Sequence, residues 1–271
     1  MHTSRSLEYM YYGWKGRSRA EERETCSETA VYSTILRLWE SFLEAAPQLC
    51  FQLYIVFKEK PEERIATATL RGVAVFSSWA SLAVTAVMFF KRHRIGLGET
   101  EKVNFTSQLF YFLWRVCETG GRVLCIALFA STFEYWVFAV LCSHYVIMVV
   151  WFIWVNSNRD SWAVLTCFLF GYVLLFYMPF HSRPSRYLHL FYYVIFHAEN
   201  FLMLGLWAGM TSDRDAWFYI PVIVAVVVFF FLHIVMQVVY YKAFHPKSKD
   251  IDWCTTCDWK TVHQSLKNLR S

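Results

Sequence analysis

The hydrophobic positions of this 271-residue chain form seven long runs separated by short polar segments. A helix needs about 20 apolar residues to cross a bilayer of roughly 30 Å, and each run has that length or nearly so. Inside lipid such a run has to satisfy its own backbone hydrogen bonds, which favours a helix. The pattern predicts an all-α, polytopic membrane helix bundle. The runs extend over Tyr32–Phe57, Ala66–Phe90, Phe105–Ala130, Phe133–Val155, Trp162–Phe180, Tyr187–Met210 and Ala216–Tyr241.

The polar residues at the two ends of the chain set the predicted domain boundaries. Residues 1–31 form an amphipathic, basic N-terminal arm, residues 32–241 a transmembrane helical domain, and residues 242–271 a C-terminal tail. The composition supports a membrane protein, because 56% of the residues are hydrophobic and 17% are charged. No signal peptide is visible in the first thirty residues, so we expect an internal helix to start insertion.

Basic residues gather at four places, and these places predict the topology. They are Lys15–Arg23, Lys91–Arg94, Arg183 with Arg186, and the C-terminal tail. Loops rich in Lys and Arg stay in the cytosol, so both termini are expected there. Seven full crossings would put Arg183 outside. We therefore predict six spans and one re-entrant segment over residues 162–180; an ordinary short span in that place is the alternative.

Three of the runs carry charged or strongly polar side chains at helical spacing. A charge near the middle of a bilayer costs about 2.5 to 3.5 kcal/mol, and residues three, four or seven apart share one face of a helix. We therefore expect these stripes to face the interior of the bundle. They consist of Arg37, Glu40, Glu44 and Gln48 in the first run, Arg115, Glu118 and Arg122 in the third, and His197, Glu199 and Asn200 in the sixth.

The sequence leaves more than one interpretation of these stripes open. Opposite charges on neighbouring helices can form ion pairs whose only role is to fix the register of the helices. Some of the side chains could also lie at the membrane interface. The third interpretation is a continuous polar pathway through the bundle. We favour the pathway, because three separate helices carry such groups.

No motif of a catalytic or cofactor site is found in the sequence, such as a P-loop, G-x-S-x-G, H-E-x-x-H or a dinucleotide fingerprint. We predict that the protein is not an enzyme and has no cofactor. Cys254 and Cys257, near His245 and His263, resemble half of a zinc site, but a second ligand pair is missing, so no metal site is predicted. The net charge of +5 suits anionic lipid, and no nucleic-acid partner is expected.

The first run also carries a long motif. Residues 36–55 read LRLWESFLEAAPQLCFQLYI. This sequence resembles the signature helix of the XK-related family, whose members carry a pattern close to LRLLE-x-FLE-x-APQL-x-LQLYI. The resemblance covers about residues 29–246. It includes Arg122–Val123, Ala127–Ser131, Glu199–Asn200, Leu206–Trp207 and Tyr240–Pro246.

The resemblance implies a multi-pass protein of the plasma membrane. Several members of the family are phospholipid scramblases that expose phosphatidylserine on apoptotic cells after caspase cleavage. Others have no established scrambling activity, and the founding member works as a partner of another membrane protein. Passive scrambling of membrane phospholipids along the charged stripes is therefore the expected function. The alternatives are an ion or solute conduit, and a structural or escort subunit that binds a single-span membrane protein or a second copy of itself.

The resemblance also has consequences for the length of the chain and for its activation. Members of the family usually have about ten hydrophobic segments in two similar halves, with a re-entrant segment in each. This chain resembles the last seven, so the first three are expected to be missing from this sequence. A caspase is a candidate partner. Asp250 and Asp252 are the candidate cleavage sites in the tail, although neither lies in a clean D-x-x-D sequence.

Overall fold

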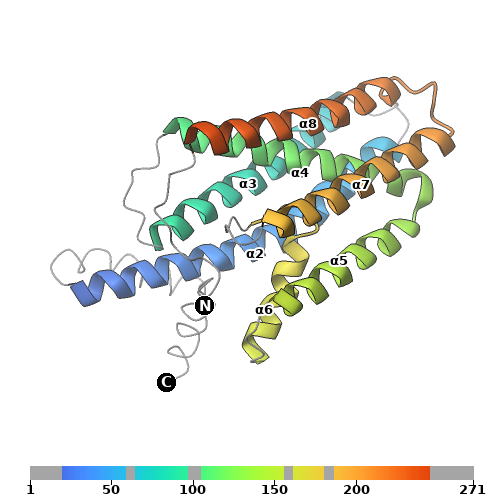
Figure 1. Ribbon diagram of the computed structural model, residues 1–271. Coiled ribbons are helices and arrows are strands. Elements are labelled where there is room, and N and C mark those ends of the chain that lie inside the picture. Colours follow the sequence, from blue (N-terminus) through green and yellow to red (C-terminus); the bar gives the residue numbers. More distant parts are fainter. Residues whose placement is uncertain (1–19, 59–64, 97–104, 156–160, 180–185, 245–271) are drawn as a thin grey trace.

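The structure, a computed structural model, describes residues 20–58, 65–96, 105–155, 161–179 and 186–244. Helices and short turns make up these ranges (Figure 1), which confirms the predicted all-α bundle. The elements are α2 (Ala20–Lys58), α3 (Ile65–Gly96), α4 (Phe105–Phe133), α5 (Trp136–Val155), α6 (Ser161–Val173), α7 (Arg186–Met210), α8 (Tyr219–Val239) and a π-helical turn, η2 (Tyr240–Phe244).

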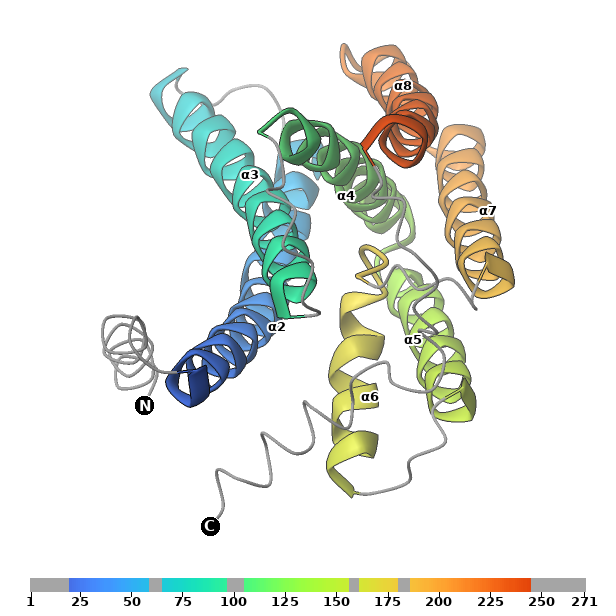
Figure 2. The same cartoon turned by 60° about the vertical axis from the view of Figure 1, so that its left-hand side comes forward.

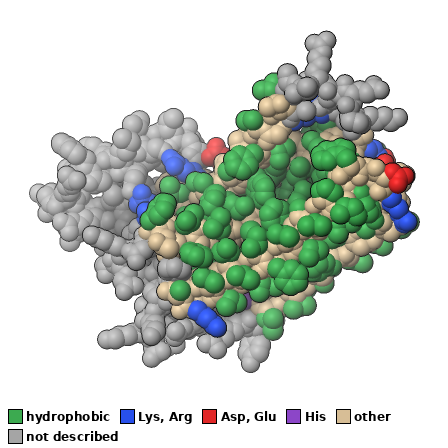
Figure 3. Space-filling model, turned by 90° about the horizontal axis from the view of Figure 1, so that it is seen from above, with side chains coloured by type: hydrophobic (Ala, Val, Ile, Leu, Met, Phe, Trp, Pro, Cys, Tyr) green, Lys and Arg blue, Asp and Glu red, His purple; other side chains and the backbone are tan. Residues whose placement is uncertain are grey.

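Five of the described helices are long and apolar enough to cross a membrane; they are α3, α4, α5, α7 and α8. Helix α2 has 39 residues and is long enough to cross a membrane, but its charged and amide side chains make it less apolar than these five helices. Its crossing of the membrane as the sixth span therefore stays a prediction. Figure 3 shows a broad face covered by hydrophobic side chains, with charged side chains at its edges. A surface of this kind is suited to lipid.

The segment after α5 contains a helix of the short length that the predicted re-entrant segment requires. Helix α6 has 13 residues, too few to cross a bilayer, and after Val173 the chain leaves helical geometry beside α4 (Figure 2). The first turns of α7 lie beside the last turns of α5. The contact that shows this is between the rings of Trp151 on α5 and Phe191 on α7, which lie 6.0 Å apart. The end of α5 and the start of α7 therefore lie on the same side of the bundle.

Ring contacts define the two ends of the bundle. At one end Phe57 of α2 lies 5.3 Å from Phe218, which precedes α8; we call this the hairpin end, because α4 turns into α5 there. At the other end Phe90 of α3 stacks on Tyr111 of α4 at 4.2 Å. We call it the basic end, because Lys91 follows directly. The positive-inside rule predicts that the basic end faces the cytosol.

Helix α4 lies at the centre of the bundle. In its apolar stretch 72% of the residues are buried, against 11 to 33% in the other four candidate spans. Two glycines let α3 and α8 approach it. A Cβ added to Gly120 would come within 2.3 Å of the Trp79 ring of α3, and one added to Gly121 would lie 3.7 Å from Phe229 of α8. The small residues thus allow close helix contact.

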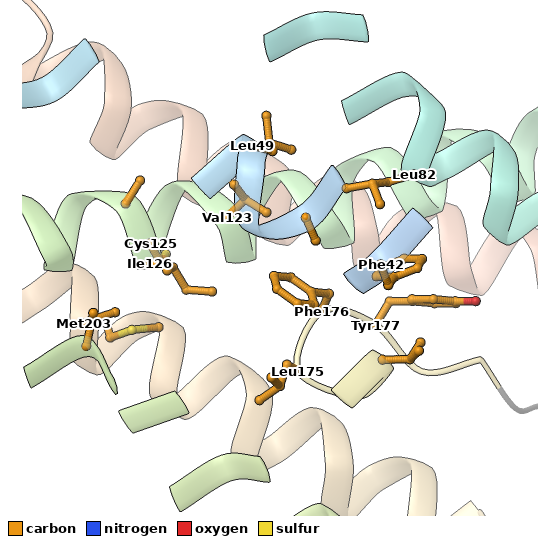
Figure 4. Close-up of a cluster of buried hydrophobic side chains, with 14 of the residues drawn as sticks. Phe42, Leu49, Leu82, Val123, Cys125, Ile126, Leu175, Phe176, Tyr177 and Met203 are labelled. Atoms are coloured by element: carbon orange, nitrogen blue, oxygen red, sulfur yellow. The ribbon is translucent and has the colours of Figure 1, made fainter. Parts of the chain in front are cut away.

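The hydrophobic core joins α2 to α4 and to the segment after α6 (Figure 4). Leu38, Phe42 and Leu49 recur at helical spacing along α2 and are almost completely buried. The ring of Phe42 stacks on Tyr177 at 4.9 Å and lies 6.0 Å from Phe176. One face of α2 therefore packs against the non-helical segment that follows α6.

Candidate functional site: a buried line of charges along α4

Four side chains from α4, α5 and α7 form a hydrogen-bonded network in the middle of the bundle, which we call the polar centre: Arg122, His144, Glu199 and Asn200. Arg122 is fully buried. It donates from Nη1 to Asn200 Oδ1 and from Nη2 to Glu199 Oε2, both at 2.9 Å. Its Nε donates to the carbonyl of Leu175, also at 2.9 Å. Arg122 thereby joins α4 to α7 and to the segment after α6.

The polar centre also reaches the carbonyl of Leu174. The Nε2 atom of His144 lies 3.2 Å from this oxygen, and Tyr192 donates its hydroxyl hydrogen to the same oxygen at 3.0 Å. Backbone carbonyls inside lipid need a hydrogen-bond partner. Side chains of α4, α5 and α7 therefore bind the carbonyls of Leu174 and Leu175 in the turn after α6.

A second buried ion pair lies on α4 closer to the basic end. Arg115 and Glu118 are both buried and bonded to each other, and Glu118 Oε1 accepts a hydrogen bond from the backbone N–H of Met178 at 3.3 Å. Arg115 and Arg122 are seven residues apart, which is about 10 Å along a helix. Residues 174–178 are thus held at both ends by charged groups of α4.

Aromatic rings surround the guanidinium of Arg115. Its central carbon lies 4.2 Å from the centre of the Trp114 ring, 4.7 Å from that of Tyr111 and 4.9 Å from that of Tyr177. The faces of aromatic rings attract cations, and this attraction grows when water is excluded. The rings therefore offset part of the cost of burying Arg115.

A pair of histidines connects the ion pair to the polar centre. The rings of His197 on α7 and His233 on α8 lie 5.1 Å apart, and Trp114 Nε1 donates to His233 Nδ1 at 3.0 Å. A small cavity of about 20 Å³ lies beside both, and Glu118 and Asn200 are among its other lining residues. A space of this size holds about one water molecule. Polar groups therefore follow one another from Arg115 to the polar centre.

The structure places the charged stripe of α2 elsewhere. Arg37, Glu40, Glu44 and Gln48 are all exposed on the outer face of this helix. The reason is that the apolar residues of α2, including Phe42, take the face that packs on the core. The predicted stripes of α4 and α7 thus come together in one site, while the stripe of α2 is exposed and lies outside this site.

Two polar side chains of the candidate site were not predicted from the sequence, His144 on α5 and His233 on α8. Both lie in runs that read as almost uniformly apolar. The presence of an ionisable histidine inside an apolar run could have identified both. Such a residue is rare inside a span and usually faces the interior of the bundle.

An apolar cavity of about 820 Å³ lies between α2, α4, α5 and α6. Glu134 lines it at the hairpin end, where Lys58 Nζ lies 3.3 Å from Glu134 Oε1. Phe51 and Phe138 line it and are exposed on the outside of the bundle. Other lining residues are Pro47, Ile126, Tyr145 and Tyr172.

Some predicted sites fall outside the part of the chain that the structure describes. They are Asp250 and Asp252, and the pair Cys254 and Cys257. In the described ranges no group of three or more His, Cys, Asp or Glu side chains is arranged to hold a metal ion.

Comparisons with known proteins agree with the motif of α2. The family model of the XK-related protein matches residues 2–246. A curated relative called XK-related protein 8, from Gasterosteus aculeatus, is 26% identical over 237 residues, which are 83% of this chain and 57% of that relative. The chain thus spans less than two thirds of the relative's length. Because the family model matches nearly the whole chain, this protein belongs to the XK-related family.

Proposed function

We propose that this protein lets phospholipids cross the plasma membrane passively, with their head groups passing along the charges of α4. The observation that carries the proposal is the line of buried polar groups from Arg115 to Arg122, which continues to the half-buried Glu199, inside an otherwise apolar bundle. Guanidinium groups suit the phosphate of a head group, and carboxylates suit its ammonium group. Membership of the XK-related family supports the same function, because the resemblance implies that several members of this family are phospholipid scramblases.

The acyl tails need an apolar route next to the polar one. The cavity between α2, α4, α5 and α6 has about 820 Å³, and exposed aromatic residues such as Phe51 line it. This volume is within the range of small-molecule sites, about 300 to 1,000 Å³. The proposal assigns the tails to this side of α4.

The line of charges is closed in the present arrangement. Arg122 and Glu199 bind each other at 2.9 Å, and Glu118 binds Arg115 and the backbone of Met178. A head group has to replace some of these contacts, which favours a regulated protein over a permanently open one. Activation in apoptosis, in which a caspase cuts the tail at Asp250 or Asp252 and phosphatidylserine is exposed, is one candidate for this regulation, although neither residue lies in a clean D-x-x-D sequence.

The proposal is tested by reconstituting the purified protein into liposomes that contain a fluorescent phospholipid. A membrane-impermeant quencher removes the signal of the outer leaflet, and scrambling brings the inner-leaflet lipid into its reach. We expect quenching beyond the outer-leaflet half, and a loss when Arg115, Glu118 or Arg122 is replaced by Ala. If all three variants scramble like the parent protein, the head groups do not follow α4. Conductance recorded on the same liposomes distinguishes lipid passage from ion passage.

A second candidate function, a subunit that binds another membrane protein, is favoured by the exposed stripe on α2. Glu44 and Gln48 lie on the outside of the bundle, where lipid would leave their polar groups without partners. A partner helix would cover them. In this case Glu44→Ala reduces co-purification of a membrane partner, and the purified chain alone does not scramble lipid.

A further inference from the structure

The buried hydroxyl of Tyr177 forms no hydrogen bond with any residue that the structure describes. Tyr177 follows α6, and its side chain is completely buried. The ring stacks on Phe42 of α2 at 4.9 Å, and Figure 4 shows the hydroxyl oxygen pointing away from Phe176. Buried polar atoms are nearly always hydrogen-bonded, so this hydroxyl needs an explanation.

Two other tyrosines show what a hydroxyl with a structural role does in this bundle. Tyr192 is buried as deeply as Tyr177, and its hydroxyl donates to the carbonyl of Leu174 at 3.0 Å. Tyr219, the first residue of α8, donates to the carbonyl of Ala208 at 3.0 Å. Each of these hydroxyls joins two elements. A phenylalanine in place of Tyr177 would fill nearly the same space without burying a polar atom, so a role in holding the fold does not account for its hydroxyl.

The nearest charged groups are the ion pair of Arg115 and Glu118. The guanidinium carbon of Arg115 lies 4.9 Å from the centre of the Tyr177 ring, and both charges are close enough to act on the Tyr177 hydroxyl. Glu118 binds the guanidinium through one oxygen and the backbone N–H of Met178 through the other, at 3.3 Å. A carboxylate thus lies between a guanidinium and a backbone N–H, and the hydroxyl of the preceding residue is a further donor at the same place.

We propose that Arg115 and the hydroxyl of Tyr177 form a binding site for the phosphate of a phospholipid, with the N–H of Met178 as a third donor. Glu118 occupies this site while no lipid is present. A phosphodiester carries one negative charge, as a carboxylate does, so the exchange leaves the charge of the site unchanged. Guanidinium groups bind phosphate through two parallel hydrogen bonds. This inference rests on the proposed function, because a lipid has to reach α4.

The hydroxyl of Tyr177 affects which anion the site prefers. Glu118 belongs to the same helix as Arg115, which gives it an advantage over an anion that has to arrive from the membrane. Its carboxylate leaves the hydroxyl unpaired, and an unpaired buried donor lowers the stability of that state. A phosphate can bind the guanidinium, the N–H and the hydroxyl together. Without the hydroxyl, Glu118 should keep the site more firmly and the head group should pass more slowly.

Tyr177→Phe tests the site, because it removes the hydroxyl and keeps the ring. No hydrogen bond among the described residues is lost, so the Tm should equal that of the parent or exceed it. Scrambling in liposomes should be about tenfold slower, because a hydrogen bond to a charged group is lost. Tyr219→Phe is the matched control. It should lower the Tm and scramble at the parental rate, since its hydroxyl binds a carbonyl at the hairpin end. The proposal is wrong if Tyr177→Phe scrambles like the parent, or if its Tm falls as in Tyr219→Phe.

Lipid binding can be measured without transport, by thermal unfolding in a nonionic detergent. The ligands are dioctanoyl phosphatidylglycerol, which has a phosphate and no ammonium group, dioctanoyl glycerol, which has the same tails without a phosphate, and inorganic phosphate. A ligand that binds the folded state raises the Tm. We expect phosphatidylglycerol to raise the Tm of the parent more than dioctanoyl glycerol does, and to lose this advantage in Tyr177→Phe. Equal rises in both proteins contradict the site, and an equally large, Tyr177-dependent rise with inorganic phosphate contradicts its assignment to a lipid.

Glu118→Gln tests the exchange between the carboxylate and the phosphate. Removing the competing charge should lower the concentration of phosphatidylglycerol that gives half of the rise in Tm; an equal or higher concentration means that Glu118 does not occupy the phosphate site. A parent that shows the Tyr177-dependent rise but moves no lipid refutes the proposed function and leaves the phosphate site intact. A parent that scrambles at the same rate as Tyr177→Phe refutes the site and leaves the proposed function intact.

Discussion

Arg122 uses the three nitrogens of its guanidinium on three acceptors, the carbonyl of Leu175, Asn200 Oδ1 and Glu199 Oε2. Each acceptor is buried or half-buried, so removing Arg122 leaves polar atoms without their donor inside the bundle. The cost of that loss is larger than the net value of the ion pair itself.

We therefore predict that Arg122→Ala lowers the free energy of unfolding by about 3 to 5 kcal/mol. Adding Glu199→Ala removes the charge that the first substitution left unpaired, so the double variant should be more stable than the sum of the two single effects. A double-mutant cycle measured by chemical denaturation in detergent checks this. Residues that share one network are expected to couple by about 0.5 to 3 kcal/mol. Effects that simply add would contradict the network.

Glu44 provides the matched control on the outside of the bundle. It belongs to the same kind of charged stripe as Glu199, but its side chain is exposed on α2. We predict that Glu44→Ala leaves the Tm nearly unchanged, because surface substitutions have small effects. If Glu44→Ala destabilises the isolated protein as strongly as Arg122→Ala, the outward position of the stripe is wrong. A loss of scrambling with an unchanged Tm would indicate a role of the stripe in transport.

The residues of the polar centre were only partly predictable from the sequence. Helical spacing places Arg115, Glu118 and Arg122 on one side of α4, because that spacing is a property of a single helix. It does not say which helix lies opposite, so the bonds from Arg122 to Glu199 and Asn200 had to come from the structure. His144 could not be ranked, because its two contacts, the Glu199 carboxylate and the Leu174 carbonyl, belong to other elements.

At the scale of the elements, close packing of α3 on α4 depends on Gly120. A Cβ at this position would come within 2.3 Å of Trp79, and Trp79 is held there by its Nε1, which donates to the carbonyl of Val116 at 3.0 Å. The indole therefore has little freedom to move aside. A Cβ added to Gly72 of α3 would meet nothing within 4 Å, which makes this glycine the natural comparison.

We predict opposite effects for the same substitution at these two glycines. Gly120→Ala should lower the Tm, because overpacking costs about 1 to 3 kcal/mol. Gly72→Ala should leave the Tm unchanged or raise it, because Ala is favoured over Gly in a helix by roughly 0.5 to 1 kcal/mol. Thermal unfolding in detergent measures both. A Gly120→Ala variant as stable as Gly72→Ala would show that α3 does not lie on α4 as described.

The re-entrant segment shows what a sequence can predict about an element. Counting basic loops indicated that the run over residues 162–180 does not cross the membrane, and the short α6 with its 13 residues agrees. The point where the helix breaks was not predictable, because Leu174 and Leu175 are ordinary apolar residues. Their carbonyls are stabilised outside a helix by Arg122 and Tyr192, which belong to other helices.

At the scale of the whole molecule, composition predicted the membrane bundle, because nothing else buries so many apolar residues. The expectation that every charged stripe faces the interior holds for α4 and α7 and not for α2. The energetic rule behind it requires only that a charge avoid lipid. The outward stripe of α2 is the feature that favours the second proposal, a subunit that binds another membrane protein.

The orientation of the bundle follows from its two ends and can be tested directly. Tyr135 is exposed at the hairpin end, in the turn between α4 and α5, and Lys91 marks the basic end. The positive-inside rule places Lys91 in the cytosol, so Tyr135 should lie outside the cell. We predict that Tyr135→Cys reacts with a membrane-impermeant maleimide on intact cells, and that Lys91→Cys reacts after the membrane is permeabilised. The parent chain, labelled in parallel, accounts for its own cysteines. The reverse labelling pattern would show that the bundle has the opposite orientation in the membrane. The tail, with Asp250 and Asp252, would then lie out of reach of a cytosolic caspase.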